Sequence, residues 1–364
     1  MLFELIAYIL SFVIPESNAW IFSADGSRRF ADNPRFFFEW VIKHVDQDCI
    51  WITSNKSESL KRGFVYKYSL MYIWCVARSR TFICSHSHYG ADISRFIRND
   101  SYLVNLWHGI PIKIMKTYKP SLIRRLLRLK QYPNLTCVNS LFDQQVFESN
   151  FFCPPNTFFY YASPRTEYLV NNQNKTRSIL WAPTFRESLS EEQSLFSALL
   201  EDSTVSLINH SLSEHDTILY VKPHPYTTIS SKHLREKLSS YHNIVFENPY
   251  VDINDLLLNS SCIITDYSSI VYDAYAMGIG ICIYLCDLGQ YSSTRGLNTD
   301  YSSFAKSSGY ASLLDAITSY LTCSPLYKDR QLSIRRFISS TSGYHYKQHS
   351  CKRIYQEIIC DTTP

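Results

Sequence analysis

The chain has 364 residues, and 45% of them are hydrophobic, which is enough to bury the cores of about two domains. Its 36 basic and 32 acidic side chains leave a net charge of only +4, so composition gives no ground for a nucleic-acid partner. The eleven cysteines form no CxxC pair and no cluster with metal-ligand spacing. A reduced, cytoplasmic chain without a protein-built metal site is therefore expected.

The N-terminal stretch MLFELIAYILSFVIP is apolar. The small residues that follow it, Ser17-Asn18-Ala19, resemble a signal-peptide cleavage site, but Glu4 lies within the run and no basic residue precedes it. The run is also too short to span a bilayer comfortably. We expect a retained helix that packs on the domain or touches the membrane.

Short apolar runs then alternate with helix-like stretches, for example at 33–45, where Asn33 is the expected N-cap and Pro34 the first helical residue. This alternation predicts parallel sheets with helices on their faces. The expected strands lie at 20–23, 49–53, 81–85, 102–107, 136–139 and 157–161 in the first half, and at 178–182, 217–222, 243–247, 262–265 and 281–285 in the second.

The strands divide into two doubly wound, Rossmann-like α/β domains, which we expect at 1–168 and 177–342. The polar stretch YLVNNQNKTR (168–177) is the expected join. A C-terminal helix within 343–364 is expected to cross back to the first domain. Since ligands bind beyond the carboxyl ends of the strands in such sheets, an interdomain cleft is the expected site.

No acidic residue occurs between Asp100 and Asp143, and segment 113–130 is basic. Within it, SLIRRLLRLK (121–130) sets leucines among arginines, as in an amphipathic helix that lies on an anionic membrane. An ordinary half-buried helix explains the pattern equally well. The basic residues of the segment are Lys113, Lys116, Lys119, Arg124, Arg125, Arg128 and Lys130.

Polar residues follow four of the expected strands. A lone histidine at such a place is usually structural, but two histidines, several cations and a helix N-terminus at one edge suit a diphosphate ester. The residues are His108, Gly109 and Lys113 in WHGIPIK, Arg186 in WAPTFRE, Lys222 and His224 in YVKPHP, and Thr265, Asp266, Ser268 and Ser269 in IITDYSS, with Arg295 farther along.

Phosphoryl transfer requires an acceptor hydroxyl held in line, a base for its proton, and positive groups on the phosphate oxygens. A histidine has a suitable unperturbed pKa for the base. We expect His108 to be that base, with His224 and the basic residues steadying the diphosphate.

Four motifs in order, WHGIPIK, APTFRE, KPHP and TDYSSIVYDAYAMG, resemble those of the CDP-glycerol glycerophosphotransferases, which build teichoic acids and related capsule polymers in bacteria. GSRRFADNPRF (26–36), SPRTEYL (163–169) and RGLNTDY (295–301) are similar to further segments of that family. The resemblance implies a GT-B fold and transfer of a polyol phosphate from a CDP-activated donor, with CMP as the leaving group. The N-terminal domain would then face the acceptor, and the C-terminal domain would bind the donor.

The resemblance also implies residue roles. His108 would be the base and His224 a catalytic phosphate contact; Gly109 and Lys113 would lie on the acceptor side. The implied donor-binding residues are Lys222, Arg186, Thr265, Asp266, Ser268, Ser269 and Arg295.

The resemblance implies a lipid-linked or growing polymeric acceptor. The basic segment 113–130 adds the expectation of an anionic membrane surface, on the inner face of the bacterial cell membrane. The polyol stays open between glycerol, ribitol and others, and Mg²⁺ on the donor diphosphate is compatible with the chain because it needs few protein ligands. The alternatives are a GT-B glycosyltransferase that uses a nucleotide sugar for capsule or lipopolysaccharide, and a non-catalytic scaffold.

Overall fold

The computed structural model describes residues 1–86, 89–115, 117–118, 121–161, 163–227, 231–297, 299–342 and 349–362, without the side chains of 231–233 and 299–300. The chain forms two compact units. Unit 1 comprises Met1–Gly109, Met115–Tyr168 and Gly343–Pro364, and unit 2 comprises Ile110–Ile114 and Leu169–Ser342. The short segment after Gly109 therefore belongs to unit 2, although its neighbours in sequence belong to unit 1.

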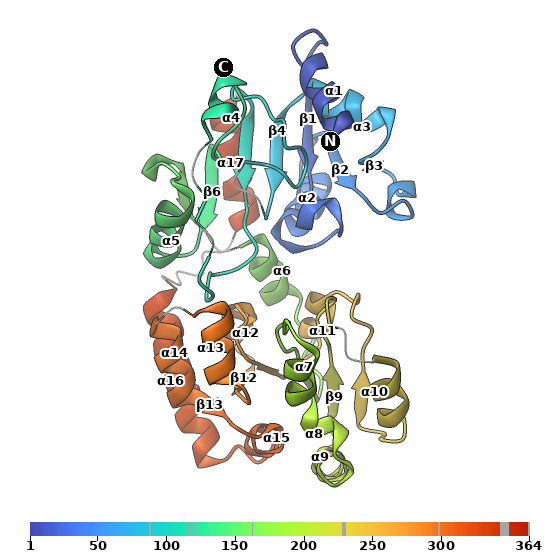
Figure 1. Cartoon of the computed structure of the whole chain (residues 1–364), viewed down its shortest axis with the longest axis vertical. Helices are drawn as coiled ribbons and strands as arrows, with labels where there is room; N and C mark the ends of the chain where they lie inside the picture. The colour runs from blue at the N-terminus through green and yellow to red at the C-terminus, as the bar shows by residue number, and fades with distance from the viewer. Residues whose placement is uncertain are drawn as a thin grey trace. The chain divides into compact units, whose positions relative to one another are not determined.

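Unit 1 is built on a parallel sheet in the order β3-β2-β1-β4-β5-β6-β7 (Figure 1). The neighbouring strands β4 and β5 are in register at Cys84 and Asn105, so their carboxyl ends meet at one edge. The strands are β1 (Ser17–Phe22), β2 (Cys49–Thr53), β3 (Phe64–Tyr66), β4 (Ser79–Cys84), β5 (Tyr102–Asn105), β6 (Leu135–Val138) and β7 (Phe158–Tyr160).

Helices cover both faces of this sheet. Successive residues of β1 point to opposite faces, so Phe22 packs with Phe37 and Ile354, whereas Ile21 packs with Ala7 and Tyr72. The helices of unit 1 are α1 (Leu2–Leu10), α2 (Asp32–His44), α3 (Leu70–Arg78), α4 (Leu122–Leu126), α5 (Leu141–Phe151) and α17 (Ser350–Thr362), with short 3₁₀ turns η1 (Asp25–Ser27), η2 (Glu58–Leu60) and η3 (Pro155–Thr157).

Unit 2 repeats the plan on a parallel sheet in the order β10-β9-β8-β11-β12-β13. Its strands are β8 (Ser178–Trp181), β9 (Ile218–Val221), β10 (Ile244–Phe246), β11 (Cys262–Thr265), β12 (Gly280–Tyr284) and β13 (Gly309–Tyr310). Its helices are α7 (Leu189–Leu195), α8 (Ser197–Leu200), α9 (Asp202–Glu214), α10 (Ser231–Leu238), α11 (Ile253–Leu258), α12 (Ile270–Met277), α13 (Leu288–Arg295), α14 (Thr299–Ser308), α15 (Leu313–Leu321) and α16 (Pro325–Thr341).

The α/β fold with two parallel sheets confirms the expected fold class, and all eleven expected strands are present. The sequence did not predict β3 or β13. Both lie at a sheet edge and are only three and two residues long, too short to show a hydrophobic period.

Along the chain, the boundary between the two units lies inside α6 (Pro164–Asn172), between Tyr168 and Leu169. We expected a polar linker at 168–177. At the other end of the chain, α17 belongs to unit 1, where Ile354 and Ile358 enter the core beside α2.

Two expectations about helices need correction. The helix expected at 33–45 begins at Asp32 after the N-cap Ala31, so Asn33 is not its cap. The helix expected at 121–130 ends at Leu126, because Arg128 adopts a left-handed conformation with φ of 51° that breaks the helical path.

Candidate functional site

The backbone after β5 turns sharply at the first predicted motif. The side chain of Asn105 accepts a hydrogen bond of 2.9 Å from the N–H of Trp107, which itself has a φ of 53°. Gly109 has a φ of 145°, a conformation open to glycine but strained for other residues. The glycine after His108 thus lets the chain turn directly away from the histidine.

The ring of His108 has a defined tautomer. Its Nδ1 lies 3.1 Å from the carbonyl oxygen of Ser85. A carbonyl only accepts hydrogen bonds, so Nδ1 carries the hydrogen and Nε2 keeps its lone pair. This arrangement leaves Nε2 as a proton acceptor.

His108 stacks on His86 with ring centroids 4.0 Å apart and planes 2° from parallel. Burial and the neighbouring His86 lower the pKa of His108 to about 3, although Asp32 acts in the opposite direction. His108 is therefore neutral at physiological pH, as a base must be before it takes a proton.

Asp32 and Arg165 complete this cluster in unit 1. Asp32 Oδ2 lies 3.8 Å from Nε2 of His86, and its Oδ1 lies 3.2 Å from Arg165, whose guanidinium also donates to the carbonyl oxygen of His108 at 3.1 Å. Burial would raise the pKa of Asp32, but His86 and Arg165 hold it below its usual value. A carboxylate charge is thus maintained beside the histidine pair.

Asn33, the expected helix cap, has a different task. Its side-chain amide donates to the carbonyl oxygens of Leu106 and Trp107, both at 2.9 Å, and accepts from the N–H of Arg165 at 3.1 Å. Asn33 therefore clamps the end of β5 to the start of α6.

In unit 2, the predicted Arg186 is the centre of a buried ion network. Its guanidinium donates to Asp266 at 2.8 Å, to Asp287 at 2.5 and 3.1 Å, and to the carbonyl and hydroxyl oxygens of Thr184 at 2.9 and 2.8 Å. These bonds occupy all five N–H groups of the side chain. Burial opposes the charge, but the two carboxylates raise the pKa of Arg186 above its usual value.

Two other predicted donor contacts are also buried. Thr265 is fully buried, and its hydroxyl donates to the carbonyl oxygen of Ala182 at 2.7 Å. Lys222 donates to the carbonyl oxygens of Pro223 and Pro249 at 3.1 and 2.8 Å. Both side chains hold loops at the carboxyl edge of the second sheet.

The remaining predicted residues of unit 2 are accessible. His224 Nδ1 accepts a hydrogen bond of 3.2 Å from the N–H of Tyr226, so in the neutral ring Nε2 carries the hydrogen. Its ring lies 5.8 Å from that of Phe185, and the guanidinium of Arg295 lies 5.9 Å from the same phenyl ring. Arg295 also pairs with Glu187 at 2.9 Å.

Ser268 and Ser269 stand before α12. Ser269 is the N-cap residue, but its hydroxyl makes no capping bond, and Ser268 Oγ accepts from the N–H of Ile270 at a long 3.4 Å.

Lys113 also belongs to unit 2, where its backbone pairs with Leu297 and its ammonium lies 5.8 Å from the ring of Tyr291. These half-buried groups can meet a ligand at the surface of unit 2.

Comparison with known proteins shows the family of this chain. Residues 6–359 match the family model of CDP-glycerol:poly(glycerophosphate) glycerophosphotransferases. The chain belongs to this family. It is therefore an enzyme, a glycerophosphotransferase, as the motifs predicted.

Individual relatives agree with that assignment. The chain is 20% identical over 381 residues to a teichoic acid glycerol-phosphate transferase of Staphylococcus aureus (strain NCTC 8325 / PS 47), with 94% of each chain covered. It is 23% identical over 338 residues to a teichoic acid poly(glycerol phosphate) polymerase of Bacillus spizizenii (strain ATCC 23059 / NRRL B-14472 / W23), with 82% of each covered. A structure of the wall teichoic acid polymerase TagF has the same fold, with a TM-score of 0.75, 17% identity, and coverage of 100% of this chain and 95% of that one.

Within this glycerophosphotransferase, the predicted site residues fall into two groups. His108, His224, Ser268, Ser269, Lys113 and Arg295 present side chains that a ligand can reach. Arg186, Asp266, Thr265 and Lys222 are buried and bonded to protein. These four side chains position loops of the second sheet, and their donor contacts stay predictions. Asp266, for example, accepts hydrogen bonds from the N–H groups of Thr184 and Tyr267.

No role for His86, Asp32 or Arg165 was predicted from the sequence. A signal for each was present. Asp32 and Arg165 lie in the quoted motifs GSRRFADNPRF and SPRTEYL, and His86 follows β4 as His108 follows β5. His86 could therefore have been predicted, because it is a polar residue that follows the strand next to β5.

Proposed function

We propose that this enzyme transfers glycerol phosphate from CDP-glycerol to a hydroxyl of a growing teichoic-acid-like polymer and releases CMP. The observation that carries the proposal is the tautomer of His108, whose Nδ1–H donates to the carbonyl oxygen of Ser85 while Nε2 keeps its lone pair. Such a group suits the removal of a proton from an alcohol.

The chemistry can be written from these groups. The acceptor hydroxyl donates its hydrogen to Nε2 of His108, and its oxygen attacks the phosphorus that carries glycerol. The bond from that phosphorus to the bridging oxygen breaks, and CMP leaves with the electron pair. The imidazolium formed at His108 is stabilised by the carboxylate of Asp32, which raises the pKa of His108.

A pKa of about 3 makes His108 a weak base before substrate arrives. The negative diphosphate of a bound donor favours the protonated ring and strengthens the base at the moment when it is needed. In unit 2, the Nε2–H of His224, the Ser269 hydroxyl and Arg295 are the groups that we assign to the donor phosphates.

We further propose that the acceptor is lipid-linked and that the enzyme works at the inner face of the bacterial cell membrane, in teichoic acid or capsule synthesis. Support comes from α4, whose side chains Leu122, Ile123 and Leu126 are 69%, 68% and 73% exposed. An ordinary half-buried helix would hide these side chains. Exposed apolar residues beside arginines are typical of membrane surfaces.

Not every residue of the basic segment 113–130 supports this. Lys130 is buried and donates to the carbonyl oxygens of Asn99 and Ser101, and Arg124 donates to those of Arg95 and Lys130. Lys116 and Lys119 lie outside the described residues. The exposed arginines of the segment are Arg125 and Arg128.

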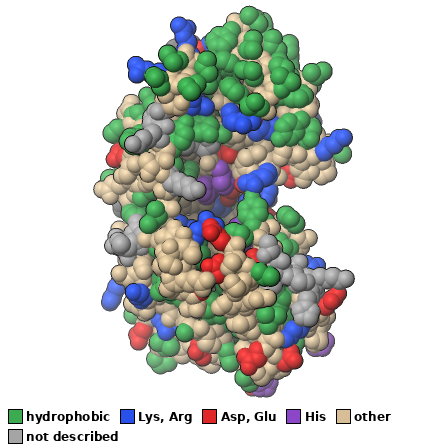
Figure 2. Space-filling view, viewed as in Figure 1, with side chains coloured by type: hydrophobic (Ala, Val, Ile, Leu, Met, Phe, Trp, Pro, Cys, Tyr) green, Lys and Arg blue, Asp and Glu red, His purple; other side chains and the backbone are tan. Residues whose placement is uncertain are grey.

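The N-terminal helix α1 adds to the same surface. Glu4 is buried and pairs with Arg95 at 2.9 Å and Lys67 at 3.7 Å, which fastens α1 to the domain. The Tyr8 hydroxyl donates to the carbonyl oxygen of Leu127 at 2.5 Å, so α1 lies beside the end of α4. Hydrophobic side chains gather with Lys or Arg side chains over this end of unit 1 (Figure 2). The exposed apolar side chains of α1 and of the residues that follow it are Leu2, Leu5, Ile9, Phe12 and Val13.

In the described part of the chain, no helix combines the length and the apolar character needed to cross a membrane. Binding to the bilayer surface through α1 and α4 is accordingly the mode that we propose. The eleven free thiols accord with the reducing side of that membrane.

The metal requirement stays a prediction. Among the described residues, no group of three or more His, Cys, Asp or Glu side chains is arranged to hold an ion. We therefore propose that Mg²⁺ is held by the donor diphosphate and water, as such ions commonly are.

The test is CMP release by purified protein with a membrane-bound acceptor. CDP-glycerol, CDP-ribitol and nucleotide sugars are compared, with wild type and His108→Ala side by side. We expect release from CDP-glycerol that depends on acceptor and on His108. Turnover of a nucleotide sugar instead, with no CMP from either CDP-polyol, would move the assignment to a glycosyltransferase.

A further inference from the structure

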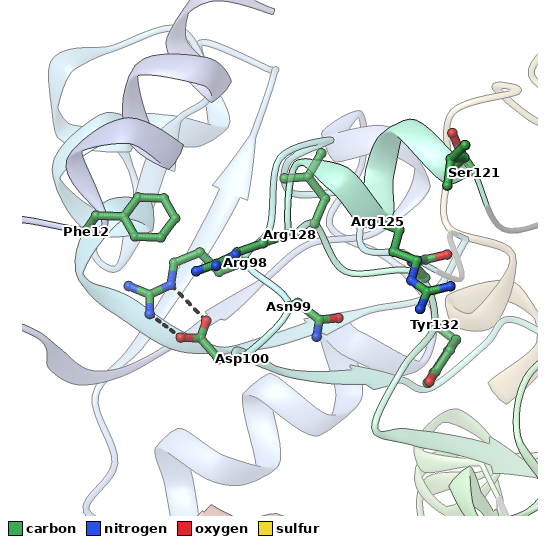
Figure 3. A pocket seen from close by; sticks show the side chains of 11 residues that line it. Phe12, Arg98, Asn99, Asp100, Ser121, Arg125, Arg128 and Tyr132 are labelled. Atoms are coloured by element: carbon green, nitrogen blue, oxygen red, sulfur yellow. Dashed lines mark hydrogen bonds and ion pairs between the residues drawn. The ribbon is translucent and has the colours of Figure 1, made fainter.

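A cavity of about 1010 Å³ opens in unit 1 between the end of α1, the turn at 98–100 and segment 121–132 (Figure 3). Its lining includes Phe12, Arg98, Asn99, Arg125, Arg128 and Tyr132. The residues assigned to catalysis are not part of it. We propose that this cavity binds the phosphate head group of an anionic membrane phospholipid, an inference that rests on the proposed membrane association.

The charges of the cavity favour an anion. Among the described residues that line the cavity, the one carboxylate is Asp100. It is already paired with Arg98, which donates to it through Nε at 2.8 Å and through a second nitrogen (Figure 3). Arg125 and Arg128 are exposed and make no ion pair with any described carboxylate. Two positive charges therefore remain uncompensated. Arginine is suited to phosphate because its planar fork can bond two oxygens at once.

The backbone around the cavity is built to hold this arrangement. Arg98 and Leu129 form an antiparallel bridge, the N–H of Asn99 donates to the carbonyl oxygen of Arg128 at 2.9 Å, and that of Lys130 donates to Ile97 at 2.8 Å. Arg128 keeps a left-handed φ of 51°, a conformation that is strained for a residue other than glycine. The strained backbone at Arg128 is thus held in place by two strand-like bonds.

The apolar rim argues for a lipid rather than a soluble phosphate. Phe12 lines one side and is fixed by Arg98, whose guanidinium lies 4.7 Å from its ring. Leu122 lines the other side, and Ile123 and Leu126 continue an exposed apolar strip along α4. A phospholipid can place its phosphate near Arg125 and Arg128 while its acyl chains contact this rim.

The experiment measures binding of the full chain to vesicles. Three kinds of vesicle are compared. The first contains phosphatidylcholine alone, the second also contains phosphatidylglycerol, and the third contains a fatty acid whose carboxylates give it the same negative charge as the second. Wild type is expected to prefer phosphatidylglycerol over the carboxylate vesicles. Each cation near an anionic membrane surface strengthens binding about fivefold, so removing both charges in Arg125→Gln/Arg128→Gln should weaken binding about thirtyfold.

Two further variants separate a phosphate site from general attraction. Arg125→Lys/Arg128→Lys keeps both charges but loses the guanidinium forks, and it should lose the preference for phosphatidylglycerol over carboxylate. Arg335→Gln/Arg336→Gln removes two exposed arginines from α16 in unit 2 and should bind as wild type does. Thermal unfolding of each variant verifies that it is folded.

The outcomes distinguish this inference from the proposed function. Equal binding of wild type to phosphate and carboxylate vesicles, or unchanged preference in the lysine variant, would overturn the head-group site and leave membrane association standing. Failure of wild type to bind any vesicle would overturn both. If the wild-type protein released no CMP from CDP-glycerol in detergent but still bound vesicles, only the assigned reaction would be contradicted.

Discussion

The imidazole rings of His86 and His108 stack face to face, 4.0 Å between centroids and 2° from parallel. The pair exists because β4 and β5 are neighbouring parallel strands, and each histidine follows the end of one of them. Two protonated rings at this distance would repel, so the stack favours a neutral His108. Asp32 stands beside His86 and offsets part of that effect.

The first prediction concerns pH. Because the pKa of His108 lies at about 3, kcat/KM for CMP release should stay nearly flat between pH 7.5 and about 5. His108→Ala should lower kcat by about 10²- to 10⁴-fold, the usual contribution of a general base. Initial rates across this range test both statements. An acid limb centred near the ordinary histidine pKa of about 6.5 would contradict them.

The same pKa predicts a stability effect with a definite sign. In the folded protein His108 stays neutral down to about pH 3, whereas in the unfolded chain it takes up a proton below about pH 6.5. Its contribution to stability is complete above that pH and is lost as pH falls toward 3. His108→Gln should therefore make the free energy of unfolding less dependent on pH between 6.5 and 4, as measured by denaturant titration.

The histidine pair yields a second prediction, in which two substitutions move one titration in opposite directions. His86 lowers the pKa of His108 and Asp32 raises it. His86→Gln should shift the acid limb of kcat/KM to higher pH, and Asp32→Asn should shift it to lower pH. His44→Gln, at the exposed end of α2, is the matched control and should shift nothing. Shifts of the same sign in both variants would contradict this. They would show that the substitutions change the pKa of His108 by disturbing the fold and not through the charges of His86 and Asp32.

A third prediction concerns the buried network of Arg186. Arg186→Gln leaves the carboxylates of Asp266 and Asp287 without their shared cation, and should lower the free energy of unfolding by about 3–5 kcal/mol. Arg177→Gln breaks an arginine–aspartate pair whose side chains are 75% and 90% exposed, and should change it by less than about 1 kcal/mol. Denaturant titration compares the two variants. Loss of donor affinity at unchanged stability in Arg186→Gln would contradict this and show that Arg186 is a donor contact.

The fourth prediction separates two residues from the same motif. Thr265→Val removes the buried hydroxyl that bonds to Ala182 and should cost about 1–3 kcal/mol of stability. Ser269→Ala removes a hydroxyl that caps nothing, so stability should hold while KM for CDP-glycerol rises. Thermal unfolding and donor titration are measured on both. The reverse pattern would mean that Thr265, not Ser269, meets the donor.

From the sequence alone, much of this protein was predictable. The alternation of apolar runs determined two parallel sheets, since a strand buried on both faces must be apolar throughout. The polar residues after those runs determined where a site would lie, and the ordered motifs determined the family. His108 and His224 were predicted in this way, because the end of an apolar strand can be recognised from the local sequence.

Only the tertiary structure decided what each polar residue does. Arg186, Lys222 and Thr265 look like ligand contacts in sequence, yet each is bonded to groups far along the chain, such as Asp287, Pro249 and Ala182. The proton positions of the two histidines likewise depend on Ser85 and Tyr226. Side-chain roles of this kind depend on which distant donors and acceptors the packed strands bring within about 3 Å, and no local pattern encodes that.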